Sequence, residues 1–311
     1  MTRITPFLLI ALVGFCLQAV SARAQLSRTF VSAASGNDAN NCERLTPCRT
    51  FQGAHDKTNP DGEITALDAG GYGALTITKS ISIVNDGVGE TSILVSGGGT
   101  GLTVNGGSAS YIHLRGIAIQ GIGFGGGTGL RYNSGFLVTL ENCVIRNHTG
   151  SGLEFFPAAT SRLMVSNSSV ADNGGHGIIA QPLGGGFAKV ALIRVVLSGN
   201  SQNGVFMAAP LGGTRAHASV RDSIAAHNLG SGFAASSGIT DQAFIVMTSS
   251  ESSHNGTGIL TSGVGANVYV GESVISANDI GMTPQNAFIT TFGDNYIVGN
   301  DSFFTGSLVK K

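Results

Sequence analysis

Charged residues are scarce in this chain, and tryptophan is absent. Only 11% of the 311 residues are charged, whereas an ordinary globular protein has roughly 25%. Disordered chains combine low hydrophobicity with high net charge, but this chain is 42% hydrophobic with a formal net charge of −1. The composition therefore excludes disorder and predicts a large buried core.

Two further absences bear on the partners. The sequence shows no block of basic residues and no basic face studded with aromatic residues, which are the usual features of nucleic-acid-binding proteins. We therefore expect no nucleic-acid partner. Aromatic platforms for stacking against sugars are also few, with five Tyr and no Trp. This scarcity weighs against strong sugar binding and favours a structural role.

Long apolar runs are missing beyond residue 24, so we expect no membrane span. Residues 1–24 have the organisation of a secretory signal peptide. Arg3 precedes an apolar run from Phe7 to Leu17, and Ala22-Arg23-Ala24 is a cleavage tripeptide of mostly small residues. The mature chain is therefore expected to be soluble and either secreted or periplasmic.

Cysteine is rare as well, with four residues, of which Cys16 leaves with the signal peptide. Cys42 and Cys48 lie close together in a loop-like segment, where an oxidising compartment favours a disulfide between them. Cys143 is then left over. It lies in a sequence repeat whose next two copies have Ser169 and Val196 at what we take as the same position, so we interpret it as a small buried residue.

Glycine, by contrast, is abundant, with 47 residues, and between about residues 142 and 300 a short phrase centred on asparagine recurs. A Gly followed by an apolar residue comes shortly after each asparagine. Self-similarity at such a period indicates a repeat architecture whose unit is too short for a pair of helices. The asparagines, at intervals of 23 to 28 residues, are Asn147, Asn173, Asn200, Asn228, Asn255 and Asn278.

Each repeat contains short runs of alternating apolar and polar residues closed by Gly, Asn or Asp, which is typical of β-strands. Three short strands and three turns per repeat predict a coil in which each strand pairs in parallel with its counterpart about 4.8 Å away. The asparagines are then expected to stack as a ladder of buried side-chain amides. We expect the glycines to follow because the bend requires a positive φ.

We divide the chain into a signal peptide at 1–24, an N-terminal cap at 25–62 and a β-helix of about ten turns at 63–311. The cap is needed because the open end of a solenoid exposes unpaired strand edges. We expect a short strand at Thr29–Ser32, a short helix at Arg49–Lys57, and then a turn at Pro60-Asp61-Gly62.

A series of short motifs follows the signal peptide. They are Val31, Gly36-Asn37-Asp38, Cys42, Pro47-Cys48-Arg49-Thr50-Phe51, Pro60, Gly62, Ile64 and Asp68-Ala69-Gly70-Gly71-Tyr72-Gly73. In these motifs, and in the asparagine repeats, the chain resembles bacterial secreted β-helix repeat proteins of the pectate-lyase-like superfamily. The resemblance covers nearly all of the mature chain and implies an all-β fold, a single right-handed parallel β-helix. It implies no particular activity, because the superfamily includes lyases, hydrolases, epimerases and adhesins.

The catalytic motifs of that superfamily are not evident. Its calcium-dependent lyases use a cluster of acids, but from residue 91 onward no two acids lie within three residues of each other. Gly175-His176-Gly177 matches a motif of polygalacturonase-like hydrolases. Their accompanying Asp pairs and Arg-x-Lys are missing, so we interpret His176 as a turn residue. We expect no metal and no cofactor.

Residues at equivalent positions of successive repeats should be neighbours in space. Six residues before the asparagines, Asp222 and Glu272 would lie about 9.6 Å apart, near the upper limit for an inverting carboxylate pair. One residue before the asparagines, His227 and His254 would stack on adjacent turns. These four are the catalytic candidates, and the alternative for both positions is a solvated turn edge. The candidates for substrate binding are Arg146, Asp172 and Arg194.

The leading hypothesis is a secreted module that binds an extracellular or cell-wall polysaccharide along a strand face. One alternative is a polysaccharide lyase, hydrolase or epimerase whose site is assembled from scattered residues, and another is a structural or adhesin-type surface protein. An enzyme acting on an anionic polysaccharide needs a basic groove. The arginines that would line such a groove if they share a face are Arg115, Arg131, Arg146 and Arg194.

Overall fold

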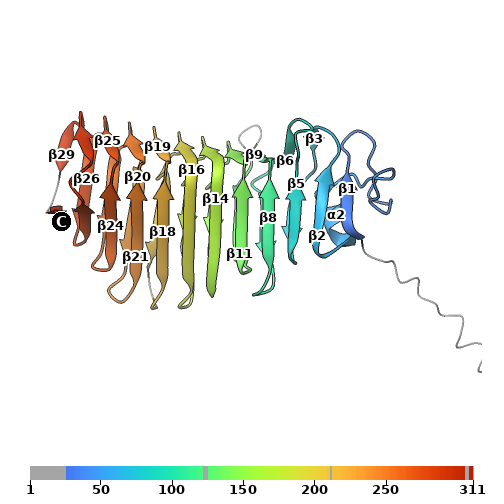
Figure 1. Cartoon of the computed structure of the whole chain (residues 1–311), viewed down its shortest axis with the longest axis horizontal. Coiled ribbons are helices and arrows are strands. Elements are labelled where there is room, and N and C mark those ends of the chain that lie inside the picture. Colours follow the sequence, from blue (N-terminus) through green and yellow to red (C-terminus); the bar gives the residue numbers. More distant parts are fainter. Residues whose placement is uncertain (1–25, 122–124, 211, 305–307, 311) are drawn as a thin grey trace, which may run out of the picture.

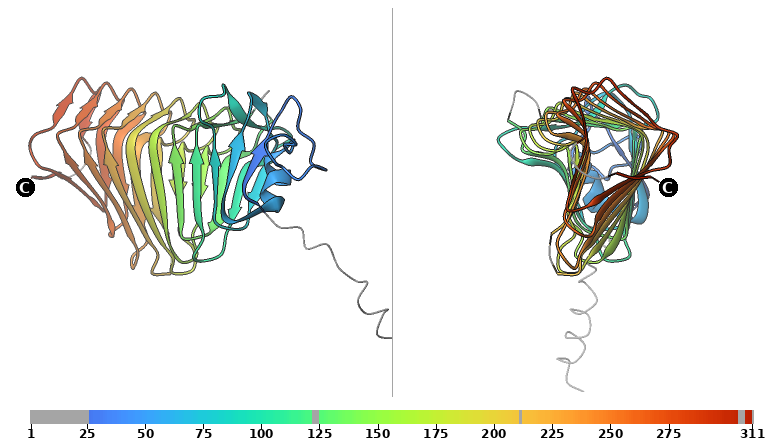
Figure 2. Two further views of the ribbon diagram at one scale, coloured as in Figure 1. Left: turned by 45° about the vertical axis from the view of Figure 1, so that its right-hand side comes forward. Right: turned by 90° about the vertical axis from the view of Figure 1, so that its left-hand side faces the viewer.

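The chain coils into an elongated solenoid of parallel strands (Figures 1 and 2). The computed structural model describes residues 26–121, 125–210, 212–304 and 308–310, so the expected signal peptide at 1–24 lies outside it. Strands from successive repeats pair in parallel and form one twenty-stranded and one ten-stranded sheet. The fold is a right-handed parallel β-helix, as expected, with one short helix among the described residues.

Two stacks of strands make up the larger sheet, and they share the long strands β14 and β16. The first stack is β1 (Leu26–Val31), β2 (Thr58–Ala66), β5 (Ile81–Val84), β8 (Tyr111–Arg115), β11 (Leu137–Glu141), the first halves of β14 (Thr160–Ala171) and β16 (Phe187–Ser198), β18 (Arg215–Arg221), β21 (Gln242–Thr248), β24 (Ala266–Gly271), β27 (Phe288–Thr291) and β30 (Leu308–Lys310). The second stack is β3 (Gly70–Gly71), β6 (Thr91–Val95), β9 (Ile117–Gly121), β12 (Val144–Arg146), the second halves of β14 and β16, β19 (Ile224–Ala226), β22 (Glu251–Ser253), β25 (Val274–Ser276) and β28 (Tyr296–Val298).

The ten-stranded sheet is the third stack and closes the coil, as the view along the solenoid shows (Figure 2). Its strands are β4 (Leu75–Ile77), β7 (Thr100–Asn105), β10 (Thr128–Ser134), β13 (Leu153–Phe155), β15 (Ile178–Ala180), β17 (Val205–Ala209), β20 (Ser231–Ser237), β23 (Thr257–Ser262), β26 (Ile280–Gln285) and β29 (Ser302–Phe304). Inward residues of all three stacks pack into one continuous apolar core. Burying each Leu, Ile, Val or Phe contributes about 1.5–3 kcal/mol.

The third stack shows how this core repeats. From β4 to β26, one inward position of these strands is apolar and almost fully buried. Its residues are Leu75, Leu102, Leu130, Leu153, Ile178, Val205, Phe233, Ile259 and Met282.

Asparagine side chains form a ladder at the turn between the second and third stacks. The Nδ2 of Asn173 donates to Asn200 Oδ1 at 2.9 Å, and Asn200 Nδ2 donates to Asn228 Oδ1 at 2.8 Å. The series continues with the same bond through Asn228, Asn255 and Asn278 to Asn300. From Asn173 to Asn278 the side chains are buried, so the ladder satisfies polar groups that water cannot reach.

Asn147 was expected in this ladder, and that expectation is wrong. The register places Arg146 opposite Ala171, so His148 rather than Asn147 lies next to Asn173. The backbone N–H of His148 donates to Asn173 Oδ1, and His148 Nε2 lies 3.2 Å from the carbonyl oxygen of Ile119. Asn147 is exposed instead, with a φ of 62°.

The expected reason for the recurrent glycines is also wrong. Gly177 and Gly204 do not have a positive φ. A Cβ on Gly204 would lie only 2.7 Å from the carbonyl oxygen of Gly232, and one on Gly177 would lie 2.6 Å from that of Gly204. Glycine is required at this position because neighbouring turns approach each other too closely for any side chain.

Positive φ angles occur instead at the two exposed corners that flank the second stack. Residues in this left-handed conformation bend the chain on either side of each short strand, and Asn and Asp tolerate it better than most residues. The φ values lie between 48° and 62°. The residues are Asn142, Asn167, Arg194, Asp222, Ser249 and Glu272 at one corner, and Asn147, Asp172, His227, His254 and Ala277 at the other.

Helix α2 (Phe51–Lys57) covers the N-terminal end of the solenoid beside β1 (Figure 1). Thr50 caps the helix by accepting a hydrogen bond from Gly53 N–H, and Phe51 and Ala54 are buried. The helix begins two residues later than expected. Strand β2 follows it directly, so the expected turn at 60–62 is a bulge within this strand, where Asp61 has a φ of 62°.

The expected disulfide joins Cys42 and Cys48 next to this helix, with 4.6 Å between their Cα atoms. The remaining described cysteine, Cys143, is buried directly after the corner residue Asn142, between β11 and β12, and burial raises the pKa of its thiol to about 11. Its backbone N–H donates to Ser168 Oγ, so Ser168, and not Ser169, is the equivalent residue of the next repeat. The prediction that Cys143 is a small buried residue is confirmed.

Candidate ligand-binding face

The two carboxylate candidates lie at an exposed corner. Asp222 and Glu272 both have a left-handed backbone and exposed side chains. Arg221 Nε lies 3.4 Å from Asp222 Oδ2, and Ser249, on the turn between the two acids, donates to Glu272 Oε2 at 3.1 Å. Neither acid lines any of the hollows described below.

The two histidine candidates do stack. The rings of His227 and His254 lie 4.9 Å apart with an interplanar angle of 27°, and both side chains are exposed. A metal site requires more ligands than two imidazoles. Within the described ranges no group of three or more His, Cys, Asp or Glu residues is arranged to hold a metal ion.

The candidates for substrate binding lie at different places. Arg146 is exposed at the end of β12, and Asp172 lies at the neighbouring corner, where it lines a shallow hollow with Asn147 and Thr149. Arg194 lies at the opposite corner, where its Nε donates to Asn167 Oδ1 at 2.6 Å. The structure therefore does not bring these residues into one groove.

The arginines that were expected to line a basic groove if they share a face do not share one. Arg115 pairs with Asp86 at the end of β8 in the first stack. Arg131 lies on β10 in the third stack, where its Nη1 is 2.6 Å from Glu154 Oε2. Arg146 and Arg194 occupy the positions described above, so any basic groove requires other residues.

A face on the outside of the first stack was not predicted from the sequence. One outward position of its strands holds aromatic, basic, Leu or Asn side chains in register: Tyr111, Leu137, Arg162, Lys189, His217, Phe244, Asn267 and Phe288. Phe187 and Arg215 lie two residues earlier on β16 and β18, and Phe136 directly precedes β11. We call these eleven residues the cationic-aromatic face.

Rings and cations alternate and touch along this face. Arg162 Cζ lies 4.5 Å from the centre of the Phe136 ring, and Arg215 Cζ lies 4.4 Å from that of Phe187. Lys189 Nζ lies 4.7 Å from the same Phe187 ring. Each cation over a ring face is attracted to it, which holds the basic side chains in place.

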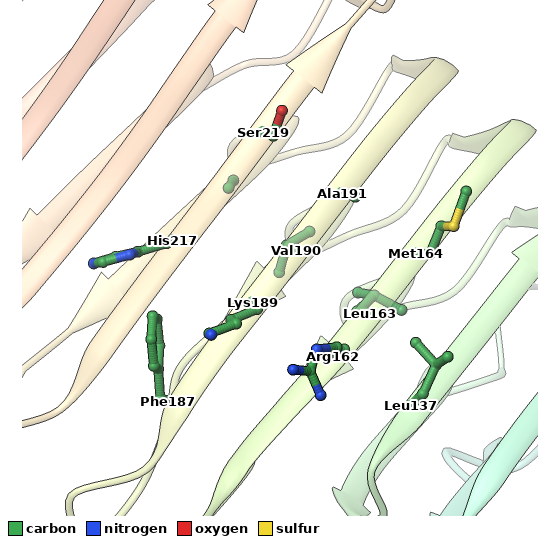
Figure 3. A pocket seen from close by; sticks show the side chains of 11 residues that line it. Leu137, Arg162, Leu163, Met164, Phe187, Lys189, Val190, Ala191, His217 and Ser219 are labelled. Atoms are coloured by element: carbon green, nitrogen blue, oxygen red, sulfur yellow. The ribbon is translucent and has the colours of Figure 1, made fainter.

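A groove of about 610 Å³ runs over these strands, and Figure 3 shows its lining. It is lined by residues that include Leu137, Arg162, Phe187, Lys189, His217 and Ser219. A hollow of about 250 Å³ lies beside the groove and shares Leu137 with it. The groove is therefore continued toward Tyr111 and His113. Another hollow, of about 260 Å³, lies elsewhere on the molecule.

The cations of this groove have no ion-pair partner among the described residues, and the acid nearest to its continuation is Asp61, which lines the smaller hollow beside the groove. Arg162, Lys189 and Arg215 take part in no ion pair with the residues that the structure describes. On the first-stack strands from β8 to β27, all of which are described, the one outward acid is Glu141, at the end of β11. The groove therefore has a positive potential that favours anions.

His217 is the titratable residue at the centre of this face. Its ring lies 4.7 Å from that of Phe187 and stacks at 4.6 Å on that of Phe244. Burial lowers the pKa of His217, and the charges of Arg215 and Lys189 lower it further. Its Nε2 has no hydrogen-bond partner in the described part of the chain. The ring is therefore neutral near pH 7.

The expectation that this chain has no basic face studded with aromatic residues is wrong. Along the in-register position of the face, each residue is separated from the next by 21 to 28 positions in the sequence, so no local cluster is visible. The signal could have been found by aligning the strands that precede the asparagine ladder. In that alignment Arg162, Lys189 and His217 occupy one outward position.

His176, interpreted as a turn residue, has no role in this face. Its Nδ1 accepts a hydrogen bond from Asn203 N–H at 3.2 Å, and its ring lies 5.0 Å from that of Phe206. Burial lowers its pKa to about 4. These contacts hold the turn before the third stack together.

No helix among the described residues is long and apolar enough to cross a membrane. No protein-family model matches the chain, and no curated protein sequence matches it either.

Solved structures do match it. An alginate lyase from Paenibacillus sp. str. FPU-7 has a TM-score of 0.61 at 14% sequence identity, covering 91% of this chain and 99% of that one. The pectate lyase Pel9A has a TM-score of 0.53 at 17% identity, covering 91% of this chain and 77% of that one. At these identities the likeness concerns the fold. This chain therefore has the pectate-lyase-like parallel β-helix fold.

Proposed function

We propose that this protein is a secreted module that binds an anionic polysaccharide along the cationic-aromatic face. The observation that carries the proposal is the row of Arg162, Lys189 and Arg215 on three adjacent strands, with no ion pair to any described residue. Guanidinium groups bind carboxylates through paired hydrogen bonds. Hydrogen bonds to charged groups contribute about 1.5–3 kcal/mol each.

The geometry of the face suits an extended polymer. Its residues repeat from strand to strand, so the face runs along the solenoid at a spacing of about 4.8 Å per strand. A chain of sugars laid along it would meet a cation or a ring on most strands, and Phe187 and Phe244 offer apolar surface to the sugar rings. This repetition supports a polymeric ligand over a small molecule.

The structural neighbours agree with this choice of ligand. Two solved structures that match with TM-scores above 0.5 are an alginate lyase and a pectate lyase, and alginate and pectate are both anionic polysaccharides. The two exposed corners, one with Asp222 and Glu272 and the other with His227 and His254, lie outside the face. We therefore assign binding to the face and no reaction to those four residues.

The test is calorimetric titration of the purified mature chain with alginate, polygalacturonate and neutral dextran, with and without calcium. We expect binding to the two acidic polymers alone. Lys189→Ala and Arg162→Ala should each weaken it about tenfold, the equivalent of about 1.4 kcal/mol. Arg194→Ala is the matched control because Arg194 is an exposed cation outside the face.

Four results would contradict the proposal. Equal affinity for dextran would show that the cations do not select the ligand, and equal weakening by Arg194→Ala would place the binding elsewhere. Preference for single-stranded DNA over both acidic polysaccharides would assign the face to nucleic acid, since basic grooves with aromatic platforms also bind single strands. Unsaturated or reducing products in the same samples would move the assignment to an enzyme.

A further inference from the structure

A row of exposed apolar side chains lies on loops that connect the third stack to the first. The loops that precede β14, β16, β18, β21 and β24 lie side by side along the lower edge of the solenoid in Figure 1 and at one corner of the coil in Figure 2. They comprise residues 156–159, 181–186, 210–214, 238–241 and 263–265. On their described parts, the large exposed apolar side chains are Leu183, Ile239 and Val264, with exposed fractions of 47%, 88% and 66%. We call these three residues the apolar ridge.

Backbone hydrogen bonds hold the ridge in place. The N–H of Leu183 donates to the carbonyl oxygen of Pro157 in the preceding loop at 2.9 Å. Within single loops, Gly186 N–H donates to Leu183 O and Ala266 N–H donates to Gly263 O, each at 2.9 Å. The loops therefore repeat at the strand spacing, and the ridge extends over about 14 Å from the loop before β16 to the loop before β24.

The same loops display almost no charge. Their sequences contain a single charged residue, Asp241. Asp241 is buried, and its Oδ1 accepts hydrogen bonds from the backbone N–H of Thr214 at 2.7 Å and from Thr214 Oγ1 at 3.1 Å. A Cβ on Gly184, next to Leu183, would meet no atom within 4 Å, so this tip projects into open space. Exposed apolar side chains grouped without charge indicate a contact surface.

Cations lie directly behind the ridge. Arg215 is the first residue after the loop at 210–214, and Arg162 and Lys189 each come three residues after their own loops. Strand residues advance about 3.3 Å each, so these cations lie within about 10 Å of the loops along their strands. None of the three forms an ion pair with a described residue. This edge of the solenoid therefore combines apolar tips with unpaired positive charge.

We propose that the apolar ridge inserts into the surface of an anionic lipid bilayer while these cations contact the headgroups. Apolar side chains beside basic residues are the composition of segments that lie in a membrane interface, where they reach about 5–10 Å into the boundary of headgroups and acyl chains. Basic residues near an anionic lipid surface add electrostatic attraction. The ridge residues do not line the groove of the cationic-aromatic face, so this inference goes beyond the proposed polysaccharide binding.

The shape of the ridge favours a fluid lipid layer over other occupants. Specific interfaces between folded proteins bury about 800 Å² on each partner with complementary packing, and a single row of three side chains offers too little surface for that. A sugar chain requires polar or aromatic partners, which the ridge does not provide. Acyl chains can surround each tip separately. The unpaired cations then select an anionic surface over a neutral one.

The test is co-sedimentation of the mature chain with vesicles of phosphatidylglycerol and phosphatidylcholine, compared with vesicles of phosphatidylcholine alone. We expect binding to the anionic vesicles that weakens as the salt concentration is raised. Ile239→Ser should lower the partition coefficient about tenfold because it removes the most exposed apolar tip. Leu229→Ser is the matched control, since Leu229 is 77% exposed at the corner between the second and third stacks.

The absence of tryptophan from the chain allows a direct probe of insertion. Ile239→Trp introduces a single tryptophan into the ridge. Its fluorescence emission should shift to shorter wavelength when anionic vesicles are added, and lipids brominated in their acyl chains should quench it. Leu229→Trp should show neither change, because its corner remains in water.

Several results would overturn the proposal. These are vesicle binding that Ile239→Ser leaves unchanged, emission of Ile239→Trp that vesicles do not alter, and equal binding to phosphatidylcholine alone. A lower sedimentation coefficient of the free protein in Ile239→Ser than in the wild type would assign the ridge to a second copy instead.

Titration with alginate separates this proposal from that of polysaccharide binding. Ile239→Ser should bind alginate as the wild type does, because Ile239 does not line the groove. Insertion of the ridge by a wild type that binds no acidic polysaccharide would support the membrane contact and overturn the proposed ligand. Alginate binding without insertion would do the reverse.

Discussion

The asparagine ladder shows how many buried hydrogen-bonding groups one residue can satisfy in a solenoid. The Nδ2 of Asn200 donates to Asn228 Oδ1 at 2.8 Å and lies 3.2 Å from the carbonyl oxygen of Val170. Its Oδ1 accepts from both the backbone N–H and the Nδ2 of Asn173. Since the side chain is fully buried, water cannot replace any of these bonds.

We expect Asn200→Ala to destabilise the protein by about 1–3 kcal/mol, the cost of leaving buried polar groups without partners. The measurement is the free energy of unfolding by chemical denaturation. Asn147→Gly is the matched control, because Asn147 is exposed, outside the ladder, and shares its left-handed position with Gly199. Equal stability of the Asn200 variant and the wild type would show that the ladder does not stabilise the fold.

The recurrent glycines make a second prediction at the same scale. A Cβ on Gly204 would lie 2.7 Å from Gly232 O and 3.1 Å from the ladder atom Asn228 Nδ2. Both are held in place by their own repeat, so Gly204→Ala should cost about 1–3 kcal/mol of strain. Gly107→Ala, whose Cβ would come no closer than 3.7 Å to its nearest neighbour, should change the melting temperature little. A similar melting temperature for both variants would contradict this account.

At the scale of strands, the features that repeat along the chain could be predicted from the sequence. The repeat spacing and the alternation of apolar residues indicated the parallel coil, and the buried column from Leu75 to Met282 follows from them. The register was harder to predict. His148 takes the place of an asparagine, and its Nε2 contacts Ile119 O as Asn200 Nδ2 contacts Val170 O. A histidine that makes the contacts of a ladder asparagine cannot be recognised from the asparagine pattern of the sequence.

The same error of one residue in the register misplaced two of the predicted residues. Arg146 was assigned to the corner position that Asn147 occupies, and Cys143 was aligned with Ser169 instead of Ser168. The cationic-aromatic face was missed for a different reason. It depends on residues such as Lys189 and His217 that become neighbours only through strand pairing, so the sequence shows each of them as an isolated residue.

The surroundings of His217 predict that ligand binding at the cationic-aromatic face depends on pH. The titratable groups around His217 are Lys189 on β16 and Arg215 on its own strand, whereas β21 contributes Gln242 and Phe244. Burial and the two cations hold the pKa of His217 below its ordinary value of 6.5. A bound anion offsets those cations and raises this pKa, so the complex takes up a proton and is favoured by acid.

Affinity for an acidic polysaccharide should therefore rise as the pH is lowered from about 7 to 5, a range in which histidine titrates. His217→Gln should flatten this dependence, because glutamine cannot be protonated. His227→Gln, at an exposed corner outside the face, should leave it unchanged. If the affinity of the wild type does not vary over this range while binding itself persists, the coupling is wrong and the proposed ligand face remains supported.

At the scale of the whole molecule, the two ends of the solenoid are where unfolding and unwanted strand pairing can begin. Each turn of a solenoid contacts only its neighbours, and an uncovered strand edge invites pairing with other chains. At the N-terminal end, the segment that follows β1 is tied to the first turn through Asp68. Its carboxylate accepts hydrogen bonds from Ser32 Oγ, from Tyr72 OH and from the backbone N–H groups of Ala33 and Ala34.

These bonds make the cap sensitive to acid. Burial alone would raise the pKa of Asp68, but the four hydrogen bonds outweigh it and lower this pKa from 3.8 to about 2. A carboxylate with a lowered pKa stabilises the fold fully above its ordinary value, and this contribution is lost as the pH falls through the lowered one. The cap should therefore loosen between about pH 4 and pH 2, before the interior repeats do.

Hydrogen exchange measured strand by strand would show this order. Protection of β1 and β2 should fall first on acidification, and Asp68→Asn should produce the same early loss at neutral pH, at a cost of about 1–3 kcal/mol. Asp61→Asn is the control because its side chain is exposed. Uniform loss of protection along the solenoid would mean that the repeats unfold as one unit. In that case the cap would not govern where unfolding begins, because its loss would then be no easier than that of any interior turn.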